Sequence, residues 1–426
     1  MGQASMRVKM SGFKGLMKVE DALARLLEAI RNYRLDVEEV PVEEAVGRVC
    51  AEDLKALVDV PPFDRSAVDG YAVRYLDVLS ASESSPVELR IVGVSKTGSR
   101  PDTLPEVKPG EAVEIYTGAP LPRSADSVVM VEYTKREEDR LWVYRPVAYM
   151  QNVSKRGEDF SVGEPVVSVG VKLKPWHVGA LASLGVTSVK VYRRPTVAVA
   201  STGSELKPLG SKISPGEVVD STRPMIKAFL RSLGCDVLDL GILEDDPAVI
   251  SEAVSKGLKT SDLMVLTGGT SLGLKDATPD GLSMVEGSRL IFHGVRMRPG
   301  KPTGAYLVNG KPVFMLSGFP VAAFVGFMVF VEPAIRGMMK CRPDPQPVVK
   351  AQVTRRVAKP PGVRAYVRVR VYSRDGVLYV EPLRLTGSGI ISTLTRGNGL
   401  LILREEVEGV EEGEEVEVLL TQPVEV

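Results

Sequence analysis

The stretch "VLTGGTSLGLKDATPD" at residues 265–280 combines features that could bind a phosphorylated ligand. An apolar segment ends in a glycine-rich turn, which carries Gly268, Gly269 and Ser271 and then the acid Asp276. Backbone N–H groups in such turns bind phosphates. The turn lacks the Gly-Lys-Ser/Thr ending of a P-loop, and its aspartate would repel a bare anion. A cation between the two removes this conflict, and Mg²⁺ accepts oxygen ligands of both kinds.

Two more loops of this type follow apolar segments, "STGSEL" at 201–206 and "LSGFP" at 316–320. Each offers hydroxyl groups and backbone N–H groups, and the first adds the carboxylate of Glu205. Simple readings stay open: the glycines can serve tight turns, Glu205 can be an acid in the first turn of a helix, and Asp276 can cap its own turn.

Other charged loops are candidates for the same ligand. "VRMRPGKP" at 295–302 places Arg298 and Lys301 around a Pro-Gly turn, which is either an anion clamp or a solvated turn. In "EDDPAVI", Asp246 before Pro247 has the pattern of a helix N-cap. Asp245, one residue earlier, can instead face a ligand.

The remaining composition excludes several kinds of chemistry. The chain has only 2 His, which argues against a histidine metal centre or a Ser-His-Asp triad. Its 3 Cys lack CxxC spacing, which argues against a structural zinc site or disulfides and fits a reducing cytoplasm. The 54 basic and 54 acidic residues balance, so no global field favours nucleic acid or a membrane surface. The uncharged run 312–331 is broken by Ser-Gly-Phe-Pro, which predicts a buried strand and helix rather than a membrane span.

The elements that must position these loops alternate between strands and helices from 195 to 340. This alternation predicts a doubly wound parallel sheet, in which ligands bind beyond the carboxyl ends of the strands. The three glycine-containing loops are therefore expected at one edge. Short valine-rich strands in 86–149 and again after 341 predict two β-domains.

The chain is thus expected to be a multidomain protein of α/β plus β class. Residues 17–60 and 150–192 form a discontinuous N-terminal α+β domain, and 61–149 form a small inserted β-domain. Residues 193–340 form the α/β domain, and 341–426 form a C-terminal β-barrel or sandwich.

Seven motifs, in this order, resemble one family: the molybdopterin molybdotransferases, to which the E domain of gephyrin is related. They are "PPFDRSAVDGYAV", "IYTGAPLP", "RGEDF", "STGSEL", "EDDP", "GGTSLGLKD" and "RPGKP", and the first is the most specific. The resemblance covers the chain from about residue 17 to its end.

The resemblance implies an enzyme that inserts molybdate, or tungstate, into adenylylated molybdopterin with release of AMP. It implies Mg²⁺ as cofactor, a molybdopterin-binding α/β domain, and a homodimer with its active site between subunits. An adenylyltransferase partner could deliver the substrate. The implied catalytic residues are Asp69, Thr117, Asp159, Glu205 and Asp276.

The resemblance also implies metal ligands and substrate-binding residues. The metal ligands are Glu205, Asp245 and Asp276. The substrate-binding residues are Gly268, Gly269, Ser271, Arg298, Lys301, Ser317 and Pro320. The family pattern L-P-G-N-P is replaced here by "LSGFP", with Ser317 for proline and Phe319 for asparagine. Ala277 stands where an aromatic residue usually follows the loop aspartate, and these departures concern the shape of the oxyanion pocket.

Two other functions remain open at this point. A single-domain sister enzyme, the molybdopterin adenylyltransferase, resembles the glycine-rich loop equally well, but the N-terminal signature and the C-terminal β-domain favour the insertion enzyme. A non-catalytic scaffold would be expected to lose its acidic residues, which this chain retains.

Overall fold

A computed structural model of the chain describes residues 16–270, 277–384 and 387–425. The described chain separates into two compact units. One contains residues up to Glu38, Gly47–Val49 and Tyr192 onward, and the other contains Glu39–Val46 and Cys50–Val191. The predicted division into four domains at the stated boundaries stays a prediction.

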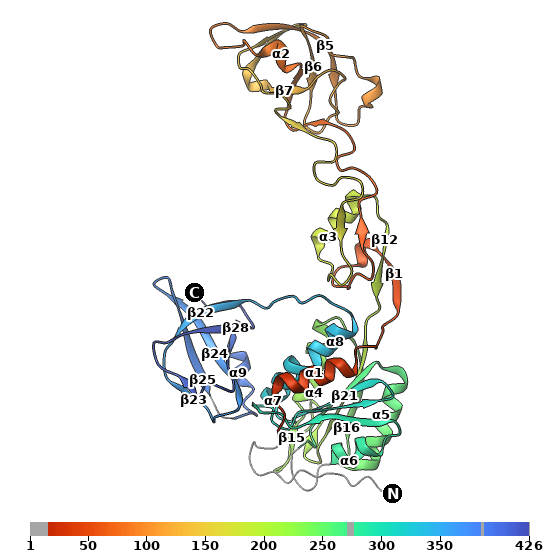
Figure 1. The fold of residues 1–426 in the computed structure, drawn as a ribbon, viewed down its shortest axis with the longest axis vertical. Helices are drawn as coiled ribbons and strands as arrows, with labels where there is room; N and C mark the ends of the chain where they lie inside the picture. The colour runs from red at the N-terminus through yellow and green to blue at the C-terminus, as the bar shows by residue number, and fades with distance from the viewer. Residues whose placement is uncertain (1–15, 271–276, 385–386, 426) are drawn as a thin grey trace. The chain divides into compact units, whose positions relative to one another are not determined.

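The larger unit contains a six-stranded sheet in the order β16-β13-β17-β21-β20-β18 (Figure 1). The first four strands are parallel; at one edge, β20 runs antiparallel to β21 and β18 runs antiparallel to β20. The strands are β13 (Thr196–Thr202), β16 (Asp236–Leu243), β17 (Leu263–Thr267), β18 (Ser288–His293), β20 (Gly304–Val308) and β21 (Lys311–Leu316). The predicted doubly wound sheet is confirmed.

Helices cover both faces of this sheet. On one face, α5 and α6 share one core with the sheet, which includes Ala198 and Ala200 of β13, Ile250 of α5 and Leu282 of α6. On the other face lie α1, α4, α7 and α8 (Figure 1). Both faces of the central strands are therefore apolar, as parallel sheets require. The helices are α1 (Val19–Ala29), α4 (Thr222–Ser232), α5 (Pro247–Thr260), α6 (Ala277–Met284), α7 (Pro320–Gly326) and α8 (Glu332–Met338).

Residues Phe327–Val331 join α7 to α8 as a π-helical segment. The resulting run, Pro320–Met338, is the one helix in the described part of the chain that is long and apolar enough to cross a membrane. However, 72% of its most apolar window is buried inside the fold. It follows β21 directly, as the strand-then-helix prediction requires, and it acts as a core helix.

The C-terminal part of this unit is a small barrel. Its strands pair in the order β24-β25-β22-β28-β26, and β26 closes the ring by pairing back with β24. Of the two architectures expected, the barrel is the observed one. Its strands are β22 (Val348–Val353), β24 (Arg364–Arg374), β25 (Val377–Arg384), β26 (Gly399–Leu403) and β28 (Glu415–Leu420); shorter elements are β23 (Val357–Ala358), α9 (Ser392–Thr395) and β27 (Gly409–Val410).

The basic loop of the α/β sheet is tied directly to the barrel. The two-residue strand β19 (Met297–Arg298) pairs in parallel with the start of β24. This pairing brings Arg298 beside a strand that is more than sixty residues later in the chain. Two further short strands, β14 (Leu206–Lys207) and β15 (Val218–Val219), pair above the carboxyl end of β13.

The second unit is built around a six-stranded sheet in the order β7-β4-β6-β5-β9-β8. Its strands are β4 (Gly70–Val73), β5 (Val87–Ser95), β6 (Glu111–Ile115), β7 (Ser127–Met130), β8 (Thr134–Glu137) and β9 (Arg140–Val143). The remaining elements are β1 (Val37–Pro41), β2 (Leu54–Lys55), β3 (Arg65–Ser66), α2 (Tyr75–Val78), β10 (Val153–Ser154), β11 (Pro165–Val167), α3 (Pro175–Ser183), β12 (Ser188–Tyr192) and the short 3₁₀ turns Val42–Glu44, Pro101–Thr103 and Val131–Tyr133. The short strands expected in residues 86–149 are part of this sheet, and their forming a separate domain stays a prediction.

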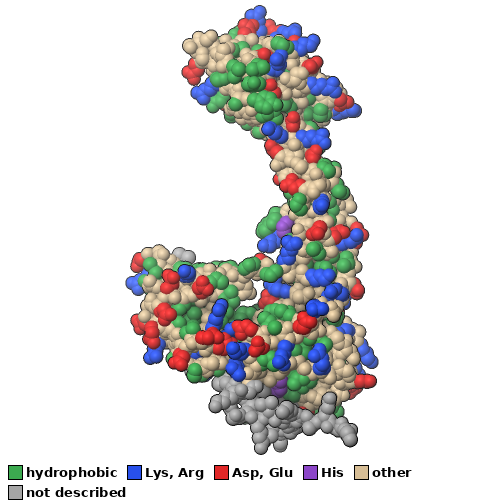
Figure 2. All heavy atoms as spheres, in the orientation of Figure 1, with side chains coloured by type: hydrophobic (Ala, Val, Ile, Leu, Met, Phe, Trp, Pro, Cys, Tyr) green, Lys and Arg blue, Asp and Glu red, His purple; other side chains and the backbone are tan. Residues whose placement is uncertain are grey.

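The charged surface agrees with the zero net charge. Figure 2 shows lysine, arginine, aspartate and glutamate side chains interspersed over the visible face of both units. Attraction of an anion must therefore come from a local site.

Candidate active site

A pocket of about 1200 Å³ opens at the carboxyl edge of the α/β sheet. After β13 the chain forms β16 on one side of β13 and then crosses to form β17 on the other side. The topological switch point therefore lies between β13 and β17. The loops after β13, β17 and β21 all line the pocket, as the sequence predicts for such a sheet. The barrel closes the opposite side with Arg368, Gly387, Ser388 and Gly389.

The glycine-rich loop after β17 approaches the neighbouring strand too closely for any side chain. A β-carbon on Gly268 would lie 2.1 Å from the carbonyl oxygen of Thr202, and one on Gly269 would lie 2.5 Å from its hydroxyl. Both glycines also have positive φ, +92° and +57°. The loop therefore presents bare backbone to the pocket, which is the surface that phosphate groups approach.

A buried hydroxyl at the same point lacks a partner. The side chain of Thr202 is 2% exposed and lines the pocket. Its Oγ1 atom is one of four buried side-chain oxygen or nitrogen atoms in the described residues that make no hydrogen bond within the chain. Because an unpaired buried hydroxyl costs about 1–3 kcal/mol, this atom is suited to a polar ligand at the switch point.

Three cationic side chains line the pocket. Arg298 and Lys301 come from the basic loop, as predicted, and Arg368 comes from β24 of the barrel. Arg368 is only 2% exposed, and it donates to Thr393 Oγ1 and to the Tyr366 carbonyl. Burial, and then the like charge of Arg298, lower the pKa of Arg368. An oxyanion in this pocket would relieve both unfavourable effects.

Two of the predicted acidic residues, Glu205 and Asp245, also line the pocket. Glu205 follows β13 and Asp245 follows β16, and both are exposed. Asp246 instead accepts hydrogen bonds from the N–H groups of Ala248 and Val249 at 2.8 and 3.1 Å, which confirms it as the N-cap of α5. Within the described ranges, no group of three His, Cys, Asp or Glu side chains is arranged to hold a metal ion.

The donor set nevertheless fits Mg²⁺ in kind. Glu205, Asp245 and the unpaired hydroxyl of Thr202 line one pocket and are all oxygen donors. The third predicted ligand, Asp276, and the predicted substrate-binding Ser271 lie outside the described residues. The Mg²⁺ site therefore stays a prediction.

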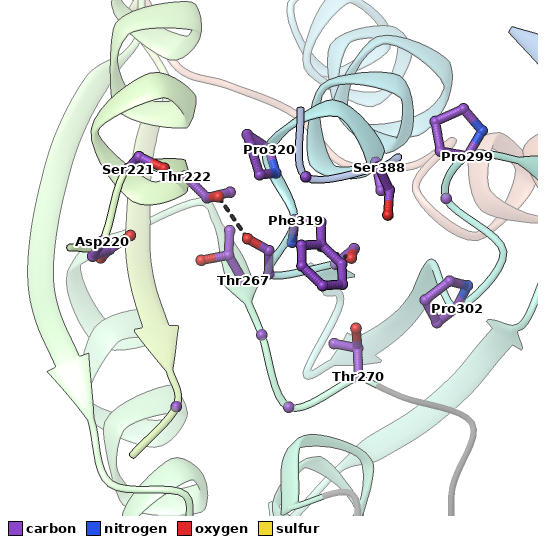
Figure 3. Close-up of a pocket in the computed structure, with 18 of the residues that line it drawn as sticks. Asp220, Ser221, Thr222, Thr267, Thr270, Pro299, Pro302, Phe319, Pro320 and Ser388 are labelled. Atoms are coloured by element: carbon purple, nitrogen blue, oxygen red, sulfur yellow. Dashed lines mark hydrogen bonds between the residues drawn. The ribbon is translucent and has the colours of Figure 1, made fainter. Parts of the chain in front are cut away.

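The loop after β21 forms the wall between the sheet and the barrel. Ser317 is 8% exposed, and its hydroxyl accepts from the N–H of Phe319 at 3.2 Å. Thr222 donates its hydroxyl to the carbonyl of Gly318 at 2.6 Å, as the dashed line in Figure 3 shows. Pro320 is buried at the first position of α7. The loop has a defined conformation although it departs from the family pattern.

In the second unit the structure brings two predicted residues together. The carboxylate of Asp69 accepts from the backbone N–H of Thr117 at 2.7 Å and from its hydroxyl at 2.8 Å. These two bonds, the backbone one first, lower the pKa of Asp69. The "DGYA" and "YTGAP" motifs therefore form one exposed, ionised site.

The third predicted residue of this unit lies in the turn of "RGED". Asp159 is exposed, and its backbone N–H donates to the Val60 carbonyl at 3.0 Å. In the same turn, Arg156 donates to Asp59 and, from its backbone, to Asp64. The turn is thereby fixed to the start of the "PPFDRSAVDGYAV" motif.

Sequence reasoning did not find several pocket residues. Arg368 lies in the alternating strand "RAYVRVRVYS", where its position looks like one more exposed basic residue. Ser388 lies in a short loop with no recognisable motif. Thr202 belongs to the loop "STGSEL", but only its environment shows that its hydroxyl is unpaired. No local signal reveals these three, because the fold determines what surrounds them.

Comparisons with known families cover most of the chain. Residues 17–185 match the "MoeA N-terminal region (domain I and II)", residues 198–337 match the "Probable molybdopterin binding domain", and residues 350–421 match the "MoeA C-terminal region (domain IV)". The resemblance seen in the motifs is therefore confirmed by the order of all three regions.

Individual relatives agree over nearly the full length. A molybdopterin molybdenumtransferase of Staphylococcus aureus is 32% identical, with 95% of each chain aligned. A protein of Methanocaldococcus jannaschii named for molybdopterin biosynthesis is 37% identical, over 96% of this chain and 98% of that protein. The crystal structure of the MoeA protein from Pyrococcus horikoshii is 34% identical, with a TM-score of 0.82, over 95% of this chain and 100% of that chain. The chain therefore belongs to the MoeA family of molybdopterin biosynthesis proteins.

Proposed function

We propose that this chain transfers molybdate, or tungstate, to adenylylated molybdopterin and releases AMP, the final step of molybdenum cofactor synthesis. Family membership supports this reaction class. The observation that carries the proposal is the pocket at the switch point, where cations, carboxylates and bare backbone N–H groups face one cavity. Its volume, about 1200 Å³, suits a substrate larger than most single-ring ligands.

The cationic side of the pocket is suited to the oxyanion. Arg298 and Lys301 approach from the α/β domain and Arg368 from the barrel, so a tetrahedral anion can be held from two directions. Charge-assisted hydrogen bonds of this kind are strongest where water is excluded. The buried position of Arg368 supports its role as the least mobile of the three.

The opposite side is suited to the pyrophosphate of the substrate. The bare backbone at Gly268 and Gly269 and the hydroxyl of Thr202 can donate to phosphate oxygens. We infer that Glu205 and Asp245, together with Asp276, hold Mg²⁺. When bound, this ion supplies charge neutralisation for the departing AMP phosphate. The chain's own donors fix the orientation of the pyrophosphate before its bond to AMP breaks.

The proposal also gives a role to three residues of the second unit, Asp69, Thr117 and Asp159. We infer that the protein works as a cytoplasmic homodimer in which these residues complete the active site between subunits. An adenylyltransferase is a suitable partner, because it would make the adenylylated substrate. The ionised Asp69, positioned by Thr117, is suited to binding a cation or a hydroxyl group of the substrate.

The test is AMP release from adenylylated molybdopterin with Mg²⁺, in separate reactions with molybdate, with tungstate and without an oxyanion. We expect release to depend on an oxyanion and to fall at least tenfold in Asp245→Asn. The matched control is Asp246→Asn, because the adjacent acid caps α5 and asparagine caps helices equally well. AMP release that does not depend on the oxyanion, or that is equal in Asp245→Asn and Asp246→Asn, would contradict the proposal.

A further inference from the structure

One aromatic side chain in the pocket has no role in binding phosphate or metal. Phe319 lines the pocket and is 60% exposed, although phenylalanine is usually buried in folded proteins. Thr267, Thr270 and Ser388, which carry hydroxyl groups, line the same pocket (Figure 3). An exposed ring among polar groups leaves apolar surface in contact with water, which a ligand with a flat apolar face would cover.

The ring is held in place on one side. A β-carbon on Gly389 would lie 3.0 Å from Cδ1 and 3.4 Å from Cε1 of Phe319, so the barrel loop packs directly against the ring. The two loops are also joined by a hydrogen bond of 3.0 Å from the N–H of Val321 to the carbonyl of Ser388. The side that faces the cavity is therefore presented by a rigid support.

The backbone of Phe319 is fixed as well. Its N–H donates to Ser317 Oγ, and its carbonyl accepts from Ala323 at 2.9 Å in the first turn of α7. The preceding Gly318 carbonyl accepts from Thr222. Because little conformational freedom remains, a ligand that covers the ring loses little affinity to ordering it.

We propose that Phe319 is a positioning and specificity residue whose exposed side stacks on a planar nitrogen heterocycle of the substrate. This rests on the proposed function, in which the substrate contains two such rings, a pterin and an adenine. Stacking on an aromatic side chain needs no particular hydrogen-bonding pattern and tolerates either ring. The cations and backbone N–H groups bind the charged parts of the substrate, and Phe319 binds a flat part that they do not recognise.

The experiment measures binding of two probes, AMP and 6-hydroxymethylpterin, by calorimetry to the full-length protein. Phe319→Leu keeps an apolar side chain but removes the flat ring. We expect it to weaken binding of the stacked probe roughly 5- to 100-fold, and to leave the other probe unchanged. Phe319→Trp should retain or strengthen binding of the same probe. The emission that this residue adds to that of the 2 Trp already in the chain should also be quenched by that probe, which a merely structural residue would not show.

Two further variants separate stacking from general damage. Gly389→Ala removes no atom from the ring, but its methyl group would displace Phe319. This variant should therefore weaken binding of the same probe. Leu290→Ala, at an exposed apolar position on β18 outside the pocket lining, should change neither affinity. Thermal unfolding of each variant shows whether the fold is retained.

The inference would be overturned if Phe319→Leu bound each of the two probes as tightly as the wild type does. Binding of neither probe by the wild type would overturn it as well. AMP release from adenylylated molybdopterin, measured on the same wild-type sample, then shows whether the proposed function fails too. If release depends on an oxyanion while Phe319→Leu binds normally, only the stacking role is wrong.

Discussion

Replacing Arg368 with methionine would test the cationic side of the pocket at its least exposed residue. Methionine keeps most of the apolar stem and removes the charge. A hydrogen bond between two charged groups contributes about 1.5–3 kcal/mol, so loss of this arginine should weaken molybdate binding about 10- to 150-fold. The upper part of this range is expected, because Arg368 is only 2% exposed and solvent screens it little.

The assay is equilibrium dialysis with radiolabelled molybdate at fixed ionic strength, with the fold of each variant checked by circular dichroism. The control is Arg370→Met, two residues further along β24. Arg370 has a side chain that is 46% exposed and pairs with Glu425. An exposed pair of this kind contributes at most about 1 kcal/mol to stability and nothing to the pocket. Wild-type affinity in a folded Arg368→Met protein would refute the reasoning.

Three other predictions address the fold and the second unit. Gly268→Ala places a methyl group 2.1 Å from a carbonyl oxygen of β13, so it should lower the free energy of unfolding in urea by about 2 kcal/mol or more. The control Gly310→Ala, also at positive φ but with open space around it, should lower it by about 1 kcal/mol. Asp262→Asn should cost about 3 kcal/mol, because it breaks a largely buried ion pair with Arg193. Burial alone would raise the pKa of Asp262, but hydrogen bonds from Arg193 and other donors lower it. Its stabilisation is therefore complete above about pH 4 and is lost below, so the difference between wild type and Asp262→Asn in urea midpoint should shrink as pH falls. Asp69→Ala should abolish AMP release in a protein that still folds, because Asp69 is exposed; retained activity would remove it from the site.

The sheet and its loops could be predicted from the sequence because their signals are local. Apolar runs such as 263–267 and the glycines that follow them define strands and turns, and parallel topology then places the loops at one edge. The N-cap at Asp246 is local in the same sense. The resemblance to the family identified Asp69 and Thr117 as site residues, but it did not predict that they contact each other.

What could not be predicted depends on contacts between distant segments. The pairing of Asp69 with Thr117 joins residues 48 positions apart. Arg368 alternates with Val367 and Val369 as an exposed strand residue would, yet it is buried and donates to Thr393, 25 positions later in the chain. Phe319 looks like a departure from a pattern until its support by Gly389 is seen. Such features require the fold, because no short window contains both partners.

The most direct test of the account measures AMP release and molybdenum transfer in one reaction. Purified protein receives adenylylated molybdopterin, Mg²⁺ and molybdate, and the pterin product is isolated for metal analysis. Because one pocket is proposed to hold both substrates, the account predicts one molybdenum atom in the product for each AMP released. AMP release with a metal-free product would contradict it, since the protein would then be a hydrolase of the pyrophosphate bond rather than an insertion enzyme.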